Sequence, residues 1–143
     1  MEDYKSVLND LSVVLRHLHK ALLDKEAENF GPVSGPYQLL NLVANHEHFA
    51  WLRHLSELMV DIDERRDEEE PVDADRAAAF RLAIESLVGP HEVSAPRFRE
   101  RYTVLLQQSP AAAMAHGDLR RVLDALPEPD KAKLIKAARR NPD

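Results

Sequence analysis

The sequence contains no cysteine and only 4 glycines in 143 residues. The lack of cysteine excludes a disulfide framework, a thiolate metal site and a cysteine nucleophile, and it agrees with a reducing cytoplasm. The shortage of glycine disfavours sheets built on tight hairpin turns, and the chain has no glycine-rich phosphate loop or dinucleotide fingerprint. These absences favour a helical protein over a sheet protein or a nucleotide-binding enzyme.

Long apolar runs are also missing, since no stretch approaches the roughly 18 residues that a membrane-spanning helix needs. The N-terminal residues, MEDYKSVLND, lack the basic start and apolar run of a signal peptide. We therefore expect a cytoplasmic protein with no membrane partner. A formal net charge of −6 disfavours nucleic acid as the main partner.

Apolar residues recur at helical spacing along most of the chain. In residues 3 to 28 they lie four and three residues apart, at Tyr4, Leu8, Leu11, Leu15, Leu18 and Leu22. A loop at residues 31 to 36 follows, with Ser34 as a capping residue and Pro36 in the first turn of a second helix predicted to run to residue 62. So short a loop predicts that the two long helices are antiparallel neighbours.

Residues 61 to 75 hold nine acidic and two basic side chains, which predicts a solvated connector. Asp73 is placed to cap a third helix, and a fourth helix begins near Pro96. Ser109 precedes a proline and is placed to open a fifth helix. The sequence thus predicts an all-α fold, a bundle of four to five main helices in a single domain over residues 1 to 126.

Residues 127 to 143 are predicted to form a basic C-terminal tail or short helix. The tail contains five basic residues: Lys131, Lys133, Lys136, Arg139 and Arg140. The simplest interpretation is a solvated end. Nucleic-acid contact lacks support because the tail has no aromatic residue to stack on bases. Docking on the acidic connector is a further alternative.

Three polar residues interrupt the second predicted helix at intervals of seven residues: Glu47, His54 and Asp61. We call them the polar stripe, because seven residues is nearly two helical turns and the three lie between two apolar arcs. A buried polar group needs a partner, at a cost of about 1–3 kcal/mol if it has none. Pairing the two long helices puts Asp10 level with His54, and His17 level with Glu47. The first interpretation is therefore a set of structural contacts that fix the register of the helices.

A metal or ligand site in the bundle core is the alternative, since helical bundles place such sites there. The candidate ligands for a divalent transition metal are His17, His19, His46, Glu47 and His54. The chain has no Glu-x-x-His or His-x-x-x-His pair, so several helices would have to supply the ligands. No catalytic or cofactor-binding residue is predicted.

Two segments, LRHLHKALLDKE at 15 to 26 and FAWLRHLSELMVDIDE at 49 to 64, carry a resemblance. The chain resembles a family of small uncharacterised bacterial helical proteins that share an HKALLD first helix and a FAWLR-x-LSEL-x-V-x-IDE second helix. The resemblance implies a bacterial cytoplasmic protein, with no cofactor and no assigned activity. The positions that it singles out are His19, Lys20, Asp24, Trp51, Arg53 and Ser56.

The apolar arcs of the second predicted helix are wider than five helices can hide internally. This favours a non-enzymatic interaction or regulatory protein that forms a homodimer through one face of the bundle. The alternative function is a metal- or small-ligand-binding bundle that uses histidines and carboxylates of the first two helices.

Overall fold

The computed structural model describes residues 3–89 and 96–129, and every regular element in these ranges is helical. The elements are α1 (Lys5–Phe30), α2 (Pro36–Asn45), the 3-10 helix η1 (Glu47–Leu52), α3 (Arg53–Asp67), α4 (Ala74–Val88), α5 (Pro96–Gln108) and α6 (Pro110–Asp124). The all-α prediction is confirmed. Within the described ranges, no helix combines the length and the hydropathy that crossing a membrane requires.

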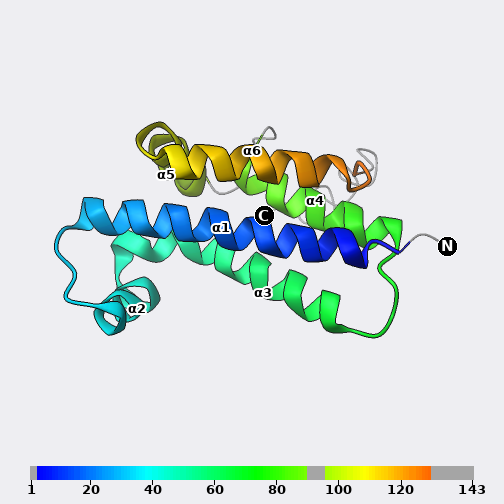
Figure 1. Ribbon diagram of the computed structural model, residues 1–143, viewed down its shortest axis with the longest axis horizontal. Helices are drawn as coiled ribbons and strands as arrows, with labels where there is room; N and C mark the ends of the chain where they lie inside the picture. The colour runs from blue at the N-terminus through cyan, green and yellow to red at the C-terminus, as the bar shows by residue number, and fades with distance from the viewer. Residues whose placement is uncertain (1–2, 90–95, 130–143) are drawn as a thin grey trace, which may run out of the picture.

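Helix α1 is the central element of the bundle, with α3 packed along one side and α6 along another (Figure 1). Its five leucines of the predicted stripe, from Leu8 to Leu22, are fully buried, which confirms that part of the prediction. Each such side chain contributes about 1.5–3 kcal/mol relative to an exposed one. The 3.6-residue periodicity of α1 therefore determines where the core lies.

The second predicted helix is not continuous. Residue His46 has an extended backbone (φ −92°, ψ 137°), and it separates α2 from η1 and α3. The Nδ1 atom of His46 accepts a hydrogen bond from the backbone N–H of His48 at 3.0 Å, which caps η1. In the segment that follows this break, Phe49 and Trp51 are buried in the core.

The start of α2 differs from the prediction in its cap. Gly35 is the N-cap residue and no side chain caps the helix, whereas Ser34 was the predicted cap. The backbone N–H of Ser34 donates to Oε1 of Gln38 instead. Pro36 occupies the first turn as predicted.

The acidic segment 61 to 75 is less open than predicted, because α3 continues to Asp67. Val72 is fully buried; its N–H donates to Oδ1 of Asp3 and its carbonyl accepts from the N–H of Tyr4, both at 3.0 Å. These bonds attach the connector to the start of α1. The pKa of Asp3 is lowered because its carboxylate accepts hydrogen bonds from the backbone N–H groups of Val72 and Lys5. Asp73 caps α4 by accepting from the N–H of Arg76 at 2.8 Å, as predicted.

Helices α5 and α6 close the bundle on the far side of α1 from α3 (Figure 1). Ser109 caps α6 by accepting from the N–H of Ala112 at 3.1 Å, which confirms the predicted cap. Phe98, Tyr102 and Leu105 are buried along α5. Of the predicted tail, residues 130 to 143, with all five of its basic side chains, lie outside the described residues.

Candidate functional site

The polar stripe of the sequence does not enter the core. Glu47, His54 and Asp61 are all exposed, and the predicted contacts of His54 with Asp10 and of Glu47 with His17 do not form. The seven-residue spacing puts residues on one line only in an uninterrupted α-helix. His54 and Asp61 keep that spacing within α3, whereas Glu47 lies in the 3-10 helix η1, whose geometry takes it off the line.

Other polar contacts join α1 to the η1–α3 segment. The Ser12 hydroxyl donates to Oδ1 of Asp63 at 2.5 Å, and the Ser56 hydroxyl lies 3.1 Å from Nε2 of His19. Burial lowers the pKa of His19, because the charged imidazolium is poorly solvated at this position. Glu26, near the C-terminal end of α1, makes the third contact of this kind, with Trp51 of η1.

The five metal candidates are not brought together. His17 and His54 are exposed on different helices, His19 contacts Ser56, and His46 caps η1. Throughout the ranges that the structure describes, no three histidine, aspartate or glutamate side chains are grouped so that they could hold a metal ion.

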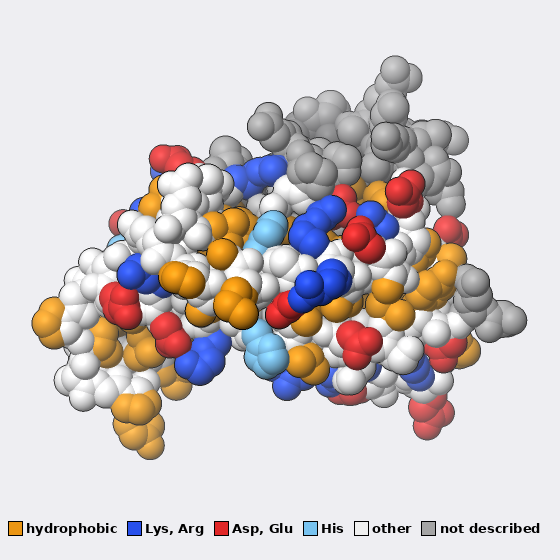
Figure 2. Space-filling view, turned by 45° about the horizontal axis from the view of Figure 1, so that its top comes forward, with side chains coloured by type: hydrophobic (Ala, Val, Ile, Leu, Met, Phe, Trp, Pro, Cys, Tyr) orange, Lys and Arg blue, Asp and Glu red, His pale blue; other side chains and the backbone are white. Residues whose placement is uncertain are grey.

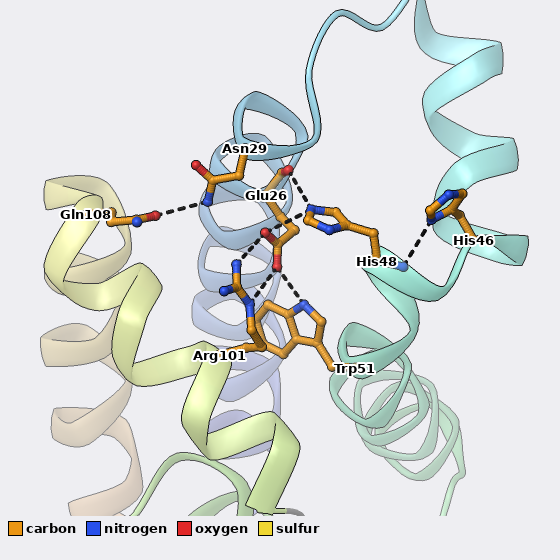
Figure 3. Close-up of polar contacts among 7 residues, drawn as sticks. All are labelled: Glu26, Asn29, His46, His48, Trp51, Arg101 and Gln108. Carbon is orange, nitrogen blue, oxygen red and sulfur yellow. Dashed lines mark hydrogen bonds and ion pairs between the residues drawn. The ribbon is translucent and has the colours of Figure 1, made fainter.

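A carboxylate absent from the sequence predictions occupies the interior instead. Glu26 of α1 has no exposed surface, and its two oxygens together receive four donor contacts (Figure 3). Oε1 lies 2.7 Å from Nη2 of Arg101 and 3.1 Å from Nε2 of His48. Oε2 accepts from Nε1 of Trp51 at 2.7 Å and from Nε of Arg101 at 3.3 Å. We call Glu26, His48, Trp51 and Arg101 the Glu26 cluster.

The geometry of η1 explains how two of the donors reach one carboxylate. Residues i and i+3 of a 3-10 helix lie directly above one another, and His48 and Trp51 are three residues apart. Nε2 of His48 also lies 3.2 Å from the backbone carbonyl of Glu26. Because both neighbours of Nε2 are acceptors, we assign the ring hydrogen to this nitrogen.

The pairing makes a buried charge tolerable. An uncompensated ionised carboxylate in the interior costs several kcal/mol, and only close donors and an opposite charge offset that cost. Both carboxylate oxygens have two donors each, and the Arg101 guanidinium supplies the countercharge. The cluster thereby connects α1, η1 and α5, and Asn29 adds a 3.0 Å bond to Gln108 at the end of α5 (Figure 3).

The sequence does contain an indication of this site. The leucine stripe of α1 advances in steps of three and four, and four residues after Leu22 the next position on it is Glu26. A carboxylate on the buried face of an apolar stripe is costly unless neighbouring elements donate hydrogen bonds to it, so such donors are expected. The identity of those donors, on η1 and α5, is not readable from the spacing.

All three donors to Glu26 also line a cavity of about 740 Å³ between η1 and α5. Its walls include Phe98 and Ala50 together with charged or ionisable side chains at Glu47, His54, Arg97 and Glu100. This volume lies within the range of small-molecule sites, about 300–1,000 Å³. Two members of the polar stripe, Glu47 and His54, thus belong to the wall of an open cavity rather than to the core.

A second polar pair lies between α5 and α6. The Tyr102 hydroxyl is 2.6 Å from Nδ1 of His116. Burial raises the pKa of Tyr102, whereas burial and the nearby Arg120 charge lower the pKa of His116. Tyr102 is therefore the donor and His116 the acceptor, a neutral pair that joins two helices.

The positions singled out by the family resemblance have structural partners. Lys20 and Asp24 form an exposed ion pair at 2.8 Å, and Nη2 of Arg53 donates to the carbonyl of Ala44 at 2.7 Å. His19 contacts Ser56, and Trp51 binds Glu26. No family model matches the chain, no curated protein matches it, and no solved structure matches it.

Proposed function

We propose that the protein is a non-enzymatic interaction module that forms a homodimer through the exposed face of α2. One observation carries this proposal: α2 has no buried residue, and two of its large apolar side chains, Tyr37 and Leu40, are 90% and 68% exposed. Exposed apolar surface of this kind is typical of a contact with another macromolecule.

The pattern of α2 supports one continuous contact surface. Tyr37, Leu40 and Ala44 follow the i, i+3, i+7 spacing of a single helical stripe, and all three are exposed. Hydrophobic side chains protrude at the left end of Figure 2, the end at which Figure 1 places α2. We call the three residues the α2 face.

The charge of α2 favours a second copy of the chain as the partner. The helix, PYQLLNLVAN, contains no charged residue, although 31% of the chain is charged and the net charge is −6. Two copies of an uncharged helix pack against each other without like-charge repulsion. A symmetric contact uses each exposed side chain twice, as an isologous dimer does.

The same proposal includes an antiparallel pairing of α1 with the η1–α3 segment in a bacterial, cytoplasmic protein of the family that the sequence resembles. The contacts support that pairing, because they run in opposite sequence order: Ser12 with Asp63, His19 with Ser56, and Glu26 with Trp51. With α1 held in this way, α2 packs against the core only through the partly buried side chains of Leu39, Leu42 and Val43.

The test is the mass of the protein in solution, measured by sedimentation equilibrium from about 1 to 300 µM. We expect a dimer whose dissociation constant rises about 100-fold or more in Leu40→Glu, because two buried leucines are lost per dimer. The matched control is Met114→Glu on α6, since Met114 is 73% exposed and the charge change is the same. A monomeric wild type over the whole range, or equal effects of the two substitutions, contradicts the proposal.

A further inference from the structure

We propose that the cavity between η1 and α5 is a binding site for a small organic monoanion, a carboxylate carried on an apolar or aromatic body. The juxtaposition behind this proposal is a partly exposed arginine, Arg101, fixed by a fully buried carboxylate beside the apolar edges of Trp51 and Phe98. The site is distinct from the α2 face, and the proposal does not depend on dimerisation.

Arg101 is prepared to receive an anion. Its Nε and Nη2 atoms bind Glu26, which leaves Nη1 without a bond to that carboxylate. The side chain is 38% exposed and lines the cavity, so it retains N–H donors for a second acceptor. An arginine whose rotamer is already held loses less conformational entropy when it binds a carboxylate.

The wall of α5 adds a second positive charge. Arg97 lies four residues before Arg101, one helical turn away, and lines the same cavity. Glu47 and Glu100 also line it; both are exposed, as Arg97 is, so water screens these three charges more than that of Arg101. With these two carboxylates on the rim, the cavity favours a single negative charge over a phosphate dianion.

The floor of the cavity is suited to an apolar body. Trp51 and Phe98 are in edge contact at 5.0 Å between ring centroids, and they are only 8% and 1% exposed. Aromatic walls with a few convergent polar groups are typical of small-ligand sites. Trp51 therefore connects the buried cluster to the surface that a ligand would cover.

The chain itself supplies the reporter for a binding experiment. Trp51 is the only tryptophan, so fluorescence excited at the red edge of tryptophan absorption reports on this cavity alone. The probes are phenylacetate, its neutral amide phenylacetamide and the cation phenethylamine, which share one ring and differ in charge. We expect a saturable change with phenylacetate, and binding at least tenfold weaker for the other two probes.

The variant to compare is Arg97→Gln, because Arg97 is exposed and is not a partner of Glu26. We expect it to weaken phenylacetate binding about tenfold, whereas Arg121→Gln, an exposed arginine on α6, leaves it unchanged. The Leu40→Glu variant should bind phenylacetate like the wild type, which separates this proposal from dimerisation. The absence of a saturable response up to about 20 mM, equal binding of the three probes, or equal loss in the two arginine variants overturns it.

Discussion

Helix α2 and the η1–α3 segment are contiguous in the sequence and opposite in burial. α2 carries no charged residue and has no fully buried side chain, although Leu39, Leu42 and Val43 are partly buried against the core. About half of the α3 residues are charged, yet the η1–α3 segment buries five apolar side chains: Phe49, Trp51, Leu52, Leu55 and Ile62. The more apolar helix is thus the less buried one. Burial depends on which side chains contact α1. The break at His46 lets η1 and α3 pack along α1, whereas α2 packs mainly on η1.

Attachment to α1 explains the difference. The η1–α3 segment is held by Glu26, His19 and Ser12 of α1, through Trp51, Ser56 and Asp63 respectively. The main packing partner of α2 is η1, the element that follows it. An element with few buried contacts opens at lower free energy than the core, so α2 is expected to be the least stable helix of the described ranges.

The largest expected difference between the two regions comes from one substitution made in each. Leu55→Ala removes a fully buried side chain of α3 and should lower the free energy of unfolding by about 3 kcal/mol. Leu40→Ala, in α2, should change it by less than about 0.5 kcal/mol. Urea denaturation at about 1 µM protein, followed by Trp51 fluorescence, measures both. Equal losses would show that α2 is as well packed as α3.

The next effect concerns the cluster that holds η1. Glu26→Gln keeps the shape but removes the charge, and it places an amide NH₂ group against donors. We expect the free energy of unfolding to fall by about 2 kcal/mol. The loss is limited because the Arg101 side chain is more than a third exposed, so water can solvate its charge in the variant. The control is Glu28→Gln, whose side chain is 69% exposed on the same helix and which should have almost no effect. Similar denaturation midpoints for the two variants would mean that the cluster does not stabilise η1.

A smaller effect should be confined to α2. Arg53→Ala removes the bond from Nη2 to the carbonyl of Ala44, an exposed contact worth about 0.5 kcal/mol. Hydrogen exchange of the α2 amides should accelerate about twofold, with the α3 amides unchanged. Lys20→Ala, which removes an exposed ion pair on α1, is the comparison. Acceleration of exchange in both helices by Arg53→Ala would contradict the separation of the two regions.

The last prediction concerns pH and the attachment of α3. Burial holds the pKa of His19 below its ordinary value of 6.5, so the unfolded chain binds this proton more readily than the folded one. The associated stability is present above that value and is lost as the pH falls through the folded pKa. His19→Gln should flatten the decline of unfolding free energy between pH 7 and 5. His17→Gln, at an exposed position, is the control and should leave that decline unchanged. Part of the decline should remain in His19→Gln, because the pKa of His116 is lowered too.

Local patterns predicted the features that depend on neighbouring residues. The leucine stripe of α1 and the caps Asp73 and Ser109 are as expected. The error that most affects the candidate site is the assumption that residues 36 to 62 form one helix. That assumption placed Glu47, His54 and Asp61 on one line between two buried arcs, whereas Glu47 lies in the 3-10 helix η1 and all three are exposed.

The Glu26 cluster was not among the sequence predictions, although one of its residues follows a readable pattern. Glu26 extends the leucine stripe by one step and was therefore recognisable as a buried charge. Its partners were not, because Arg101 is 75 residues away in the chain and His48 reaches Glu26 only through the 3-10 geometry of η1. Spacing within one helix carries no information about which distant helix packs against it.

The sequence by itself determined that this protein is helical and that α1 presents one buried face, because periodicity and composition act within a single element. The tertiary structure decided which polar residues are buried and which apolar ones are not. It buries Glu26 among three donors from η1 and α5 and leaves Tyr37 and Leu40 exposed. The physical reason is that the cost of burying a charge, and the gain from burying a leucine, depend on what the packed neighbours offer.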